Sequence, residues 1–298
     1  MNNSDADRLR QRVLELETEL QTTKALLSRI ESKTAVNSFA IPVSIPVDSS
    51  IHNLMLLSDS ALPLGSFAYS SGLESFLAHH KPLPKTQTNL TLFLKFLRLS
   101  IQSVAYTNVP YVLSAFRDPL GLADLDNDLD ASTPCTVARR ASIAQGRALL
   151  SVWEKAFSQA FKTRPNKDEG LEALLTIEIF ARDLKLASIS SDPLPLVNAH
   201  LAPLWGVVCL ALGLNLEEAG YLFLLNHAKA VLSAAVRASV MGPYMAQNIL
   251  AGRDLQSIIR QSLEKIWFLQ PEDAGQVVPT MDLWIGRHEM LYSRIFNS

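Results

Sequence analysis

The sequence is poor in cysteine: its 298 residues contain only Cys135 and Cys209, which lie far apart. Two distant cysteines exclude a disulfide framework, a CxxC redox pair and a zinc knuckle built from cysteine alone. So little cysteine is typical of a protein in a reducing compartment, and we expect a cytoplasmic location.

Several catalytic motifs are also absent. The sequence contains no Gly-x-Gly and no Gly-Lys pair, which excludes a dinucleotide fingerprint and a P-loop. It has neither a Gly-x-Ser-x-Gly elbow nor a His-Glu-x-x-His motif. The histidines are scattered over separate segments: His52, His79, His80, His200, His227 and His288. Nucleotide hydrolysis by this chain and a zinc hydrolase are therefore unsupported.

Neither sign of charge dominates, because 27 Lys and Arg stand against 29 Asp and Glu for a net charge of -2. This balance argues against a dedicated nucleic-acid binder. The most apolar stretch, Leu201 to Leu214, is interrupted by Pro203 and Gly206 and is shorter than the roughly 20 residues of a membrane span. It predicts a buried core helix, and we expect no membrane segment.

An alternating run of aspartates at 124, 126, 128 and 130 has the look of a calcium-binding loop. An EF-hand loop needs glycine at its sixth position and glutamate at its twelfth, where this chain has Leu129 and Cys135. The interpretation we favour is a solvated acidic loop between two helices.

The N-terminal segment 1–33 carries a heptad pattern. Apolar residues step by four and three from Leu9 to Ile30, with one polar position at Thr23. Charged residues occupy most flanking positions, as in a helix that pairs with a copy of itself or with another partner. The alternative is a lone, partly frayed helix, since so few heptads are marginal for a coiled coil. Residues 34–50, with Pro42 and Pro46, are expected to form a flexible linker.

From residue 51 onward the apolar residues recur at helical spacing, which predicts an all-α fold with a single helical bundle over 51–270. An Asn cap with two glutamates in the next turn marks one helix start at Asn215. The expected helices cover Thr88 to Phe116 with a bend near Asn108 and Pro110, Pro134 to Phe161, Glu169 to Leu184, a core helix ending at Leu212, Asn215 to about Val240, and Asp254 to Phe268.

The most informative stretch runs from Ser58 to Glu74 and reads SDSALPLGSFAYSSGLE. Its proline and glycine predict a turn, and Ser71 to Glu74 fits a capping box in which Ser71 caps a helix and Glu74 reaches back. Small residues surround Phe67 and Tyr69, an arrangement that lets another backbone approach closely.

This stretch resembles the N-terminal signature of the urease accessory protein family UreF, SDxxLPxGxFxxSxGLE. Further similarities follow in the family's order: Ala144 to Arg147, His200 to Leu214, Ala235 to Arg237 followed by Gln247, and the ending His288 to Ser298. The resemblance covers the chain from about Leu54 to its end. The heptad segment lies outside it, as in a eukaryotic-type member with an N-terminal extension. One departure is Pro243, which stands where the family tends to carry glutamine.

The resemblance implies an all-helical, non-enzymatic scaffold without catalytic residues, metal ligands or cofactor. Such a scaffold dimerises, binds the accessory protein UreD, called UreH in some organisms, and recruits the GTPase UreG to load nickel into apo-urease. Two alternatives stay open. An enzyme would need acid, base or metal-binding residues that converge from separate helices, and a generic coiled-coil tether would carry its function in the heptads.

The candidate partner-binding residues fall into two groups. A first group, expected to engage the GTPase or support the dimer, lies in the signature and in the motifs before Gln247: Tyr69, Gly72, Glu74, Arg237 and Gln247. Arg237 follows apolar residues, so we expect it to reach a carboxylate, a backbone carbonyl or solvent.

The second group belongs to residues 271–298, which we expect to form an extended docking arm for the UreD-type partner. Its candidates are His288, Tyr292, Arg294 and Phe296. Leu291, Tyr292, Ile295 and Phe296 have the spacing of one side of a short helix, and Pro279 and Gly286 predict that this piece is poorly tied to the bundle. The alternative is that it folds back onto the chain's own core.

Overall fold

A computed structural model describes residues 3–36, 50–81, 88–162, 168–189 and 197–297. The chain divides into two units, Met1–Asp48 and Ser49–Ser298. The first unit contains one helix, α1 (Asn3–Val36), over the predicted heptad segment. Most of the expected linker, residues 37–49, lies outside the described residues.

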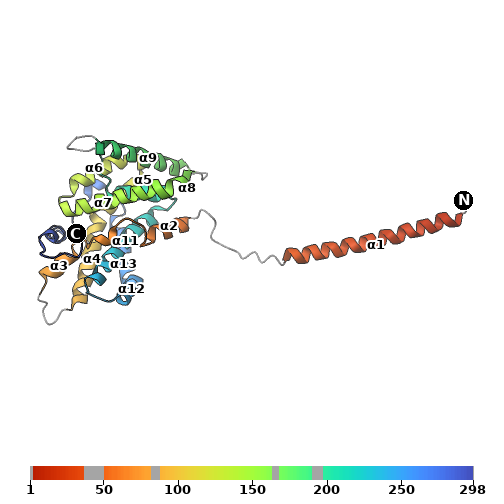
Figure 1. Ribbon diagram of the computed structural model, residues 1–298, viewed down its shortest axis with the longest axis horizontal. Helices are drawn as coiled ribbons and strands as arrows, with labels where there is room; N and C mark the ends of the chain where they lie inside the picture. Colours follow the sequence, from red (N-terminus) through yellow and green to blue (C-terminus); the bar gives the residue numbers. More distant parts are fainter. Residues whose placement is uncertain (1–2, 37–49, 82–87, 163–167, 190–196, 298) are drawn as a thin grey trace. The chain divides into compact units, whose positions relative to one another are not determined.

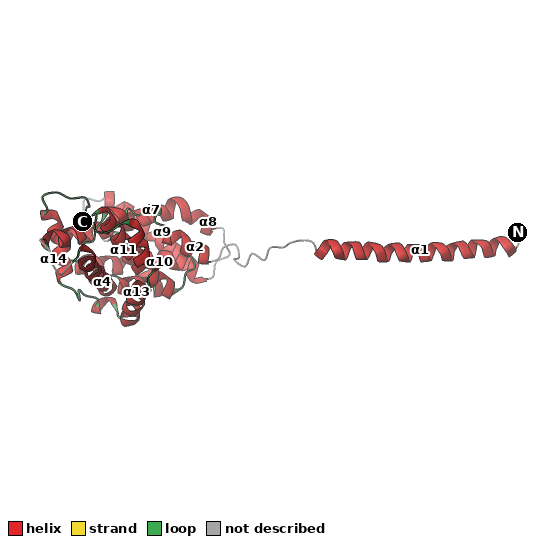
Figure 2. Cartoon of the chain, turned by 90° about the horizontal axis from the view of Figure 1, so that it is seen from below, coloured by secondary structure: helices red, strands yellow, loops and turns green. Residues whose placement is uncertain are grey.

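The second unit is a bundle of helices (Figure 1). Figure 2 shows helices and connecting loops and no strand in the described ranges, which confirms the all-α fold class. The helices are α2 (Ser50–Ser58), α3 (Leu73–His79), α4 (Asn89–Thr107), α5 (Val109–Arg117), α6 (Leu122–Ser132), α7 (Thr136–Val152), α8 (Ser158–Lys162), α9 (Asp168–Ile189), α10 (Leu201–Ala211), α11 (Leu216–Arg237), α12 (Pro243–Ala251), α13 (Arg253–Ile266) and α14 (Thr280–Arg287).

The apolar helix α10 lies in the centre of the bundle and packs against α5, α7 and α9. Gly206 allows this packing, since a Cβ atom there would lie 2.2 Å from the carbonyl oxygen of Val112 on α5. Trp205 is buried, and its indole N–H donates to the carbonyl of Ala219 over 3.1 Å. The prediction of a buried core helix at 201–212 is confirmed.

Helix α11 is long and apolar enough to span a membrane by length and composition, but 56% of that stretch is buried inside the bundle. This burial is what a central helix of a bundle requires. Its predicted start is confirmed: the Asn215 side chain accepts from the N–H of Glu218 over 2.8 Å, and Glu218 accepts in return from the N–H of Asn215 over 2.9 Å.

Other helix boundaries follow the predictions with small changes. The long apolar segment breaks at Asn108, as expected, into α4 and α5. Pro134 precedes α7 rather than occupying its first turn, because Cys135 is the cap residue. A short π-helical segment, Trp153–Phe157, joins α7 to α8 and continues the predicted helix.

Three elements differ from the sequence expectation. The first is α14 (Thr280–Arg287), a helix within residues 271–298, which were expected to be extended. The acidic stretch is helix α6, so the predicted solvated loop is wrong: Leu122, Asp126 and Leu129, spaced four and three apart, form its buried face. Helix α12 was not anticipated, and Pro243 begins it. A proline at the first position of a helix costs no hydrogen bond, because that N–H has no partner within the helix.

Candidate functional site

The signature stretch forms a loop that ends in α3. Gly72 precedes the helix with φ of 84°, a left-handed conformation that favours glycine, and a Cβ atom there would lie 3.0 Å from the backbone nitrogen of Ile285 on α14. The predicted capping box is wrong, because the cap residue of α3 is Gly72 rather than Ser71, and the backbone N–H of Glu74 lies 3.5 Å from the hydroxyl of Ser70. The carboxylate of Glu74 is therefore available for another interaction.

Glu74 binds the C-terminal arm. Its Oε1 atom accepts from the N–H of Ile295 over 2.9 Å, and its Oε2 atom accepts from the N–H of Phe296 over 3.3 Å. The next residue, Asn297, donates its N–H to the carbonyl of Ala68 over 2.8 Å. The backbone that approaches the small residues of the signature is thus the end of the same chain, which confirms that a close approach takes place.

His288 adds a second tie between the arm and the bundle. It is fully buried, and its Nε2–H donates to the carbonyl of Phe296 over 3.0 Å, which assigns the proton to Nε2. Its Nδ1 atom lies 3.8 Å from Oε2 of Glu74. The arm therefore closes a loop from His288 back to Phe296 over the start of α3.

Phe296 anchors the arm, since only 5% of its surface is exposed. The guanidinium of Arg237, at the end of α11, lies 4.4 Å from the centre of the Phe296 ring and donates to the carbonyl of Phe67. Arg237 thus reaches a backbone carbonyl, one of its predicted partners. Partial desolvation lowers the pKa of this guanidinium.

These contacts correct the description of the arm. Residues 291–297 form no helix, so the prediction of a short amphipathic helix is wrong, and the arm is held to the bundle rather than poorly tied. The alternative, that it folds back onto the core, describes the structure. The physical reason is that Glu74 satisfies backbone N–H groups that a helix would have used internally.

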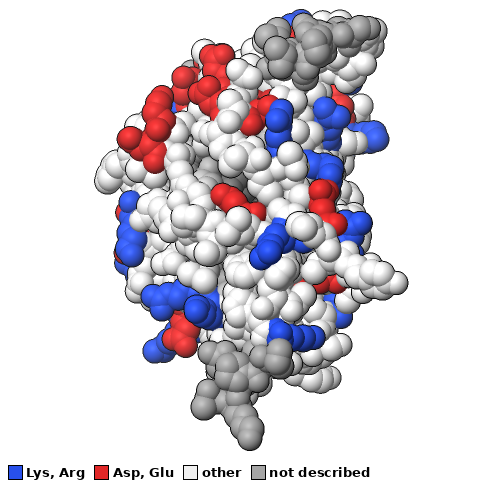
Figure 3. All heavy atoms as spheres, turned by 90° about the vertical axis from the view of Figure 1, so that its left-hand side faces the viewer, with Lys and Arg blue, Asp and Glu red and all other residues white. Residues whose placement is uncertain are grey.

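The arm nevertheless leaves large apolar side chains in solvent. Tyr292 is fully exposed, Met290 and Ile295 are exposed by 79% and 63%, and Phe67 on the facing loop is exposed by 65%. We call these four residues the arm surface. Figure 3 views the side on which the C-terminus lies in Figure 1, and this face shows white surface with a few acidic and basic side chains between.

The nine candidate residues do not all meet. Gly72, Glu74, Arg237, His288 and Phe296 converge at the junction of arm and signature. Tyr292 and Arg294 lie exposed on the arm. Nearby in the sequence, Glu289 pairs with Arg140 over 2.6 Å, and this hydrogen bond lowers the pKa of the Glu289 carboxyl. Gln247 lies exposed on α12, and Tyr69 lines a cavity.

The middle motif, Ala144 to Arg147 on α7, joins the signature to the loop before α10. Gln145 accepts from the hydroxyl of Ser66 over 2.8 Å, and Arg147 donates to the carbonyl of Asn198 over 3.3 Å. Between them, Gly146 faces the backbone so closely that a Cβ atom would lie 2.0 Å from the carbonyl oxygen of Ala199. The signature, the middle motif and the loop that precedes the His200 to Leu214 motif are therefore in direct contact.

Asp126 is the residue that sequence reasoning missed. It is fully buried, and its carboxylate accepts the N–H groups of Asn198, Ala199 and His200 over 2.6, 3.1 and 2.5 Å. Ala199 has a positive φ of 68°, so these bonds hold a conformation that alanine rarely adopts. The signal was present: Asp126 shares a helical face with Leu122 and Leu129.

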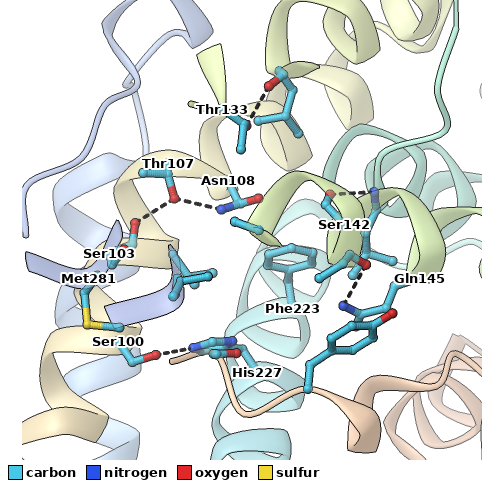
Figure 4. Close-up of a pocket in the computed structure, with 18 of the residues that line it drawn as sticks. Ser100, Ser103, Thr107, Asn108, Thr133, Ser142, Gln145, Phe223, His227 and Met281 are labelled. Atoms are coloured by element: carbon cyan, nitrogen blue, oxygen red, sulfur yellow. Dashed lines mark hydrogen bonds between the residues drawn. The ribbon is translucent and has the colours of Figure 1, made fainter. Parts of the chain in front are cut away.

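A cavity of about 450 Å³ lies among α4, α7, α11 and α14, and Figure 4 shows the polar side chains that line it. The Ser100 hydroxyl and Nε2 of His227 are 2.8 Å apart. Desolvation lowers the pKa of His227 to about 4, so the ring is neutral at neutral pH. Within the described residues, no three or more His, Cys, Asp or Glu side chains are grouped to hold a metal ion.

Comparison with known proteins relates the chain to one family. A sequence model of UreF matches residues 88–253. A Schizosaccharomyces pombe protein named uncharacterized urease accessory protein UreF-like is 39% identical over 247 residues, covering 83% of this chain and 97% of its own length.

More distant relatives agree. Urease accessory protein F of Arabidopsis thaliana is 31% identical over 248 residues, covering 81% of this chain and 90% of its own. Urease accessory protein UreF of Paenarthrobacter aurescens is 28% identical over 245 residues, with 82% and 96% covered. The family model covers the middle motif and most of the bundle, more than half of the chain, and with the 39% identical relative it shows that the chain belongs to the UreF family.

Proposed function

We propose that this protein is a non-enzymatic accessory scaffold in urease maturation that binds a UreD-type accessory protein through its arm surface. The observation that carries the proposal is that the arm has one buried apolar side chain and others that are exposed. Phe296 is buried against Arg237, whereas Tyr292 and Ile295, four residues and one residue before it, are exposed. An ordered backbone that presents large apolar side chains to solvent is typical of a protein interface.

The junction with Glu74 supports this role. A docking segment that is already ordered loses less conformational entropy on binding than a free tail does. Glu74 orders the backbone at Ile295 and Phe296, so the side chain of Ile295 is presented outward from a held position. This argument replaces the expectation that the arm is poorly tied to the bundle.

We further propose that the complex recruits the GTPase UreG, which supplies the nucleotide chemistry, and delivers nickel to apo-urease in the cytosol. Gln247 on α12 and the exposed part of Arg237 at the end of α11 are the residues assigned to the GTPase or to a homodimer contact. Nickel in this scheme is cargo, and no nucleic acid or membrane takes part.

The test is co-purification with a UreD-type protein, UreG and apo-urease, followed by nickel- and GTP-dependent urease activation. The variant Tyr292→Ala with Ile295→Ala should lose capture of the UreD-type protein, because two of the four side chains of the arm surface are removed while Phe296 and Glu74 stay. Its unfolding should be unchanged, since both side chains are exposed.

A matched control is Leu175→Ala with Ile179→Ala on α9, where two apolar residues are exposed by 51% and 50%. The control should retain capture. Equal capture by the two double variants would contradict the assignment of the arm surface. Urease activation without any need for this chain would contradict the proposed function as a whole.

A further inference from the structure

Helix α1 carries an apolar seam that nothing in its own unit covers. Val13, Leu16, Leu20 and Leu27 are exposed by 53%, 51%, 55% and 61%. An amphipathic helix of this kind gains most of its stability from packing its apolar face against a partner. We therefore expect the seam to pack against a partner helix, and the charged residues beside the seam indicate what that partner is.

Positions in the heptad follow from the spacing. Val13, Leu20 and Leu27 occupy a, and Leu16 and Thr23 occupy d. We propose that α1 pairs with α1 of a second copy of this chain as a parallel, in-register coiled coil. This goes beyond the proposed function, because it concerns only the N-terminal unit.

The flanking charges match a second copy. In a parallel pair, a g residue faces the e residue five positions further along the other helix. Arg12 at g then faces Glu17 of the second copy, and Glu19 at g faces Lys24 of the second copy. Both pairs are attractive, and the two-fold symmetry of the dimer repeats each of them.

An antiparallel pair with the same core layers fits less well. In that arrangement e faces e and g faces g, so Glu17 would still face Lys24, but Glu19 would lie opposite Leu26 and would lose its charged partner. Thr23 would lie opposite Leu20, which places a hydroxyl against an apolar side chain. In the parallel pair Thr23 meets Thr23 of the second copy, and the polar position matches itself.

The polar layer at Thr23 is tolerable because its hydroxyl is satisfied within its own helix. It donates to the carbonyl of Glu19 and lies 3.4 Å from the carbonyl of Leu20. A threonine that bonds the preceding turn presents its methyl group to the seam at little desolvation cost. Thr23 therefore sets the register without leaving a buried polar group unpaired.

Cysteine cross-linking of the full chain tests the pairing directly. In a parallel dimer, Thr23→Cys brings two thiols together across the seam, and oxidised glutathione should convert most chains to covalent dimers that a thiol reductant reverses. Thr22→Cys is the matched control, because position c points away from the seam. Both variants keep the buried Cys135 and Cys209.

The outcomes separate the arrangements. No cross-linking of Thr23→Cys, or equal cross-linking of both variants, would overturn the proposal. Cross-links that form only between Thr23→Cys and Leu20→Cys chains in a mixture would overturn it in favour of an antiparallel pair.

Charge exchange tests the register independently. Glu19→Lys or Lys24→Glu alone places like charges across the seam of a homodimer, whereas a mixture of the two variants restores attraction in mixed dimers. Mixed dimers should therefore exceed the half expected from random pairing of equal amounts, as counted by mass spectrometry with one variant tagged. A fraction of mixed dimers at or below one half would overturn the proposed register.

Discussion

Two carboxylates in the bundle make the same kind of hydrogen bond, to backbone N–H groups, in different surroundings. Asp126 accepts three backbone N–H groups from the loop before α10 and is fully buried. Glu74 accepts two backbone N–H groups from the arm, and 14% of its side chain is exposed. Water can replace Glu74 at the edge of the bundle more easily than it can replace Asp126. We therefore expect the contacts of Asp126 to stabilise the core and the contacts of Glu74 to hold a surface segment.

The comparison shows how one kind of interaction can serve both stability and presentation. A carboxylate that binds backbone N–H groups places a segment without requiring any particular side chain there. At Asp126 the placed segment is itself buried, including His200, which reaches Ser142 and Asp130 over 3.0 Å each. At Glu74 the placed segment turns Ile295 and Tyr292 to solvent.

The largest expected effect comes from Asp126→Ala. Three buried N–H groups would lose their acceptor, so we expect the free energy of unfolding to fall by about 4 kcal/mol, measured by chemical denaturation. Asp124→Ala on the exposed side of the same helix is the control for helix propensity and charge. If the two variants lost similar amounts of unfolding free energy, the contrast between Asp126 in the core and Glu74 at the edge would not hold.

Phe296→Ala tests how much of the arm belongs to the core. The buried ring lies against Arg237, and its removal should lower the free energy of unfolding by about 3 kcal/mol. The loss should appear as a lower denaturation midpoint. Tyr292→Ala, in the same arm but exposed, should stay within about 0.5 kcal/mol of the parent protein. A small effect of Phe296→Ala would show that the arm contributes nothing to the core.

Acid should weaken the core through His227. Its folded pKa is about 4, below the ordinary value of the unfolded chain, so the unfolded state takes up the proton first as the pH falls. The stabilisation is complete above about pH 6.5 and is lost as the pH falls toward 4, by about 2 kcal/mol. The readout is the free energy of unfolding at pH 7 and pH 4.5. His227→Gln should lack this part of the pH dependence, and an unchanged dependence in that variant would contradict the assignment.

The smallest effect is expected for Glu74→Gln. The amide keeps one acceptor oxygen but loses the charge, so the free energy of unfolding should fall by about 1 kcal/mol. Hydrogen exchange at the amides of Ile295 and Phe296 should become faster. Glu289→Gln, which removes only an exposed pair with Arg140, should leave both amides protected. Unchanged exchange in Glu74→Gln would show that Glu74 does not hold the arm.

Much of the fold could be predicted because helical periodicity is local. The Asn215 cap, the break at Asn108 and the buried helix at 201–212 each depend on residues within a few turns of one another. Helix α6 was missed because four aspartates outweighed the apolar face formed by Leu122 and Leu129.

The candidate site was predicted in part. The signature indicated that a backbone approaches closely, and the resemblance to UreF pointed to the signature and to the C-terminus. Which backbone approaches, and through which atoms, was not predictable. Ser71 and Glu74 have the spacing of a capping box, and only the contact with the arm shows why that local pattern fails.

The sequence by itself determined the all-α class, the family and the seam of α1, because these depend on composition, motif order and spacing along the chain. The tertiary structure alone decided the partners of the two carboxylates. Asp126 and the loop at 198–200, like Glu74 and Ile295, are distant in sequence, and their pairing depends on how the helices pack. A backbone N–H carries no sequence signal, so a carboxylate that binds it can be recognised only once the chain is folded.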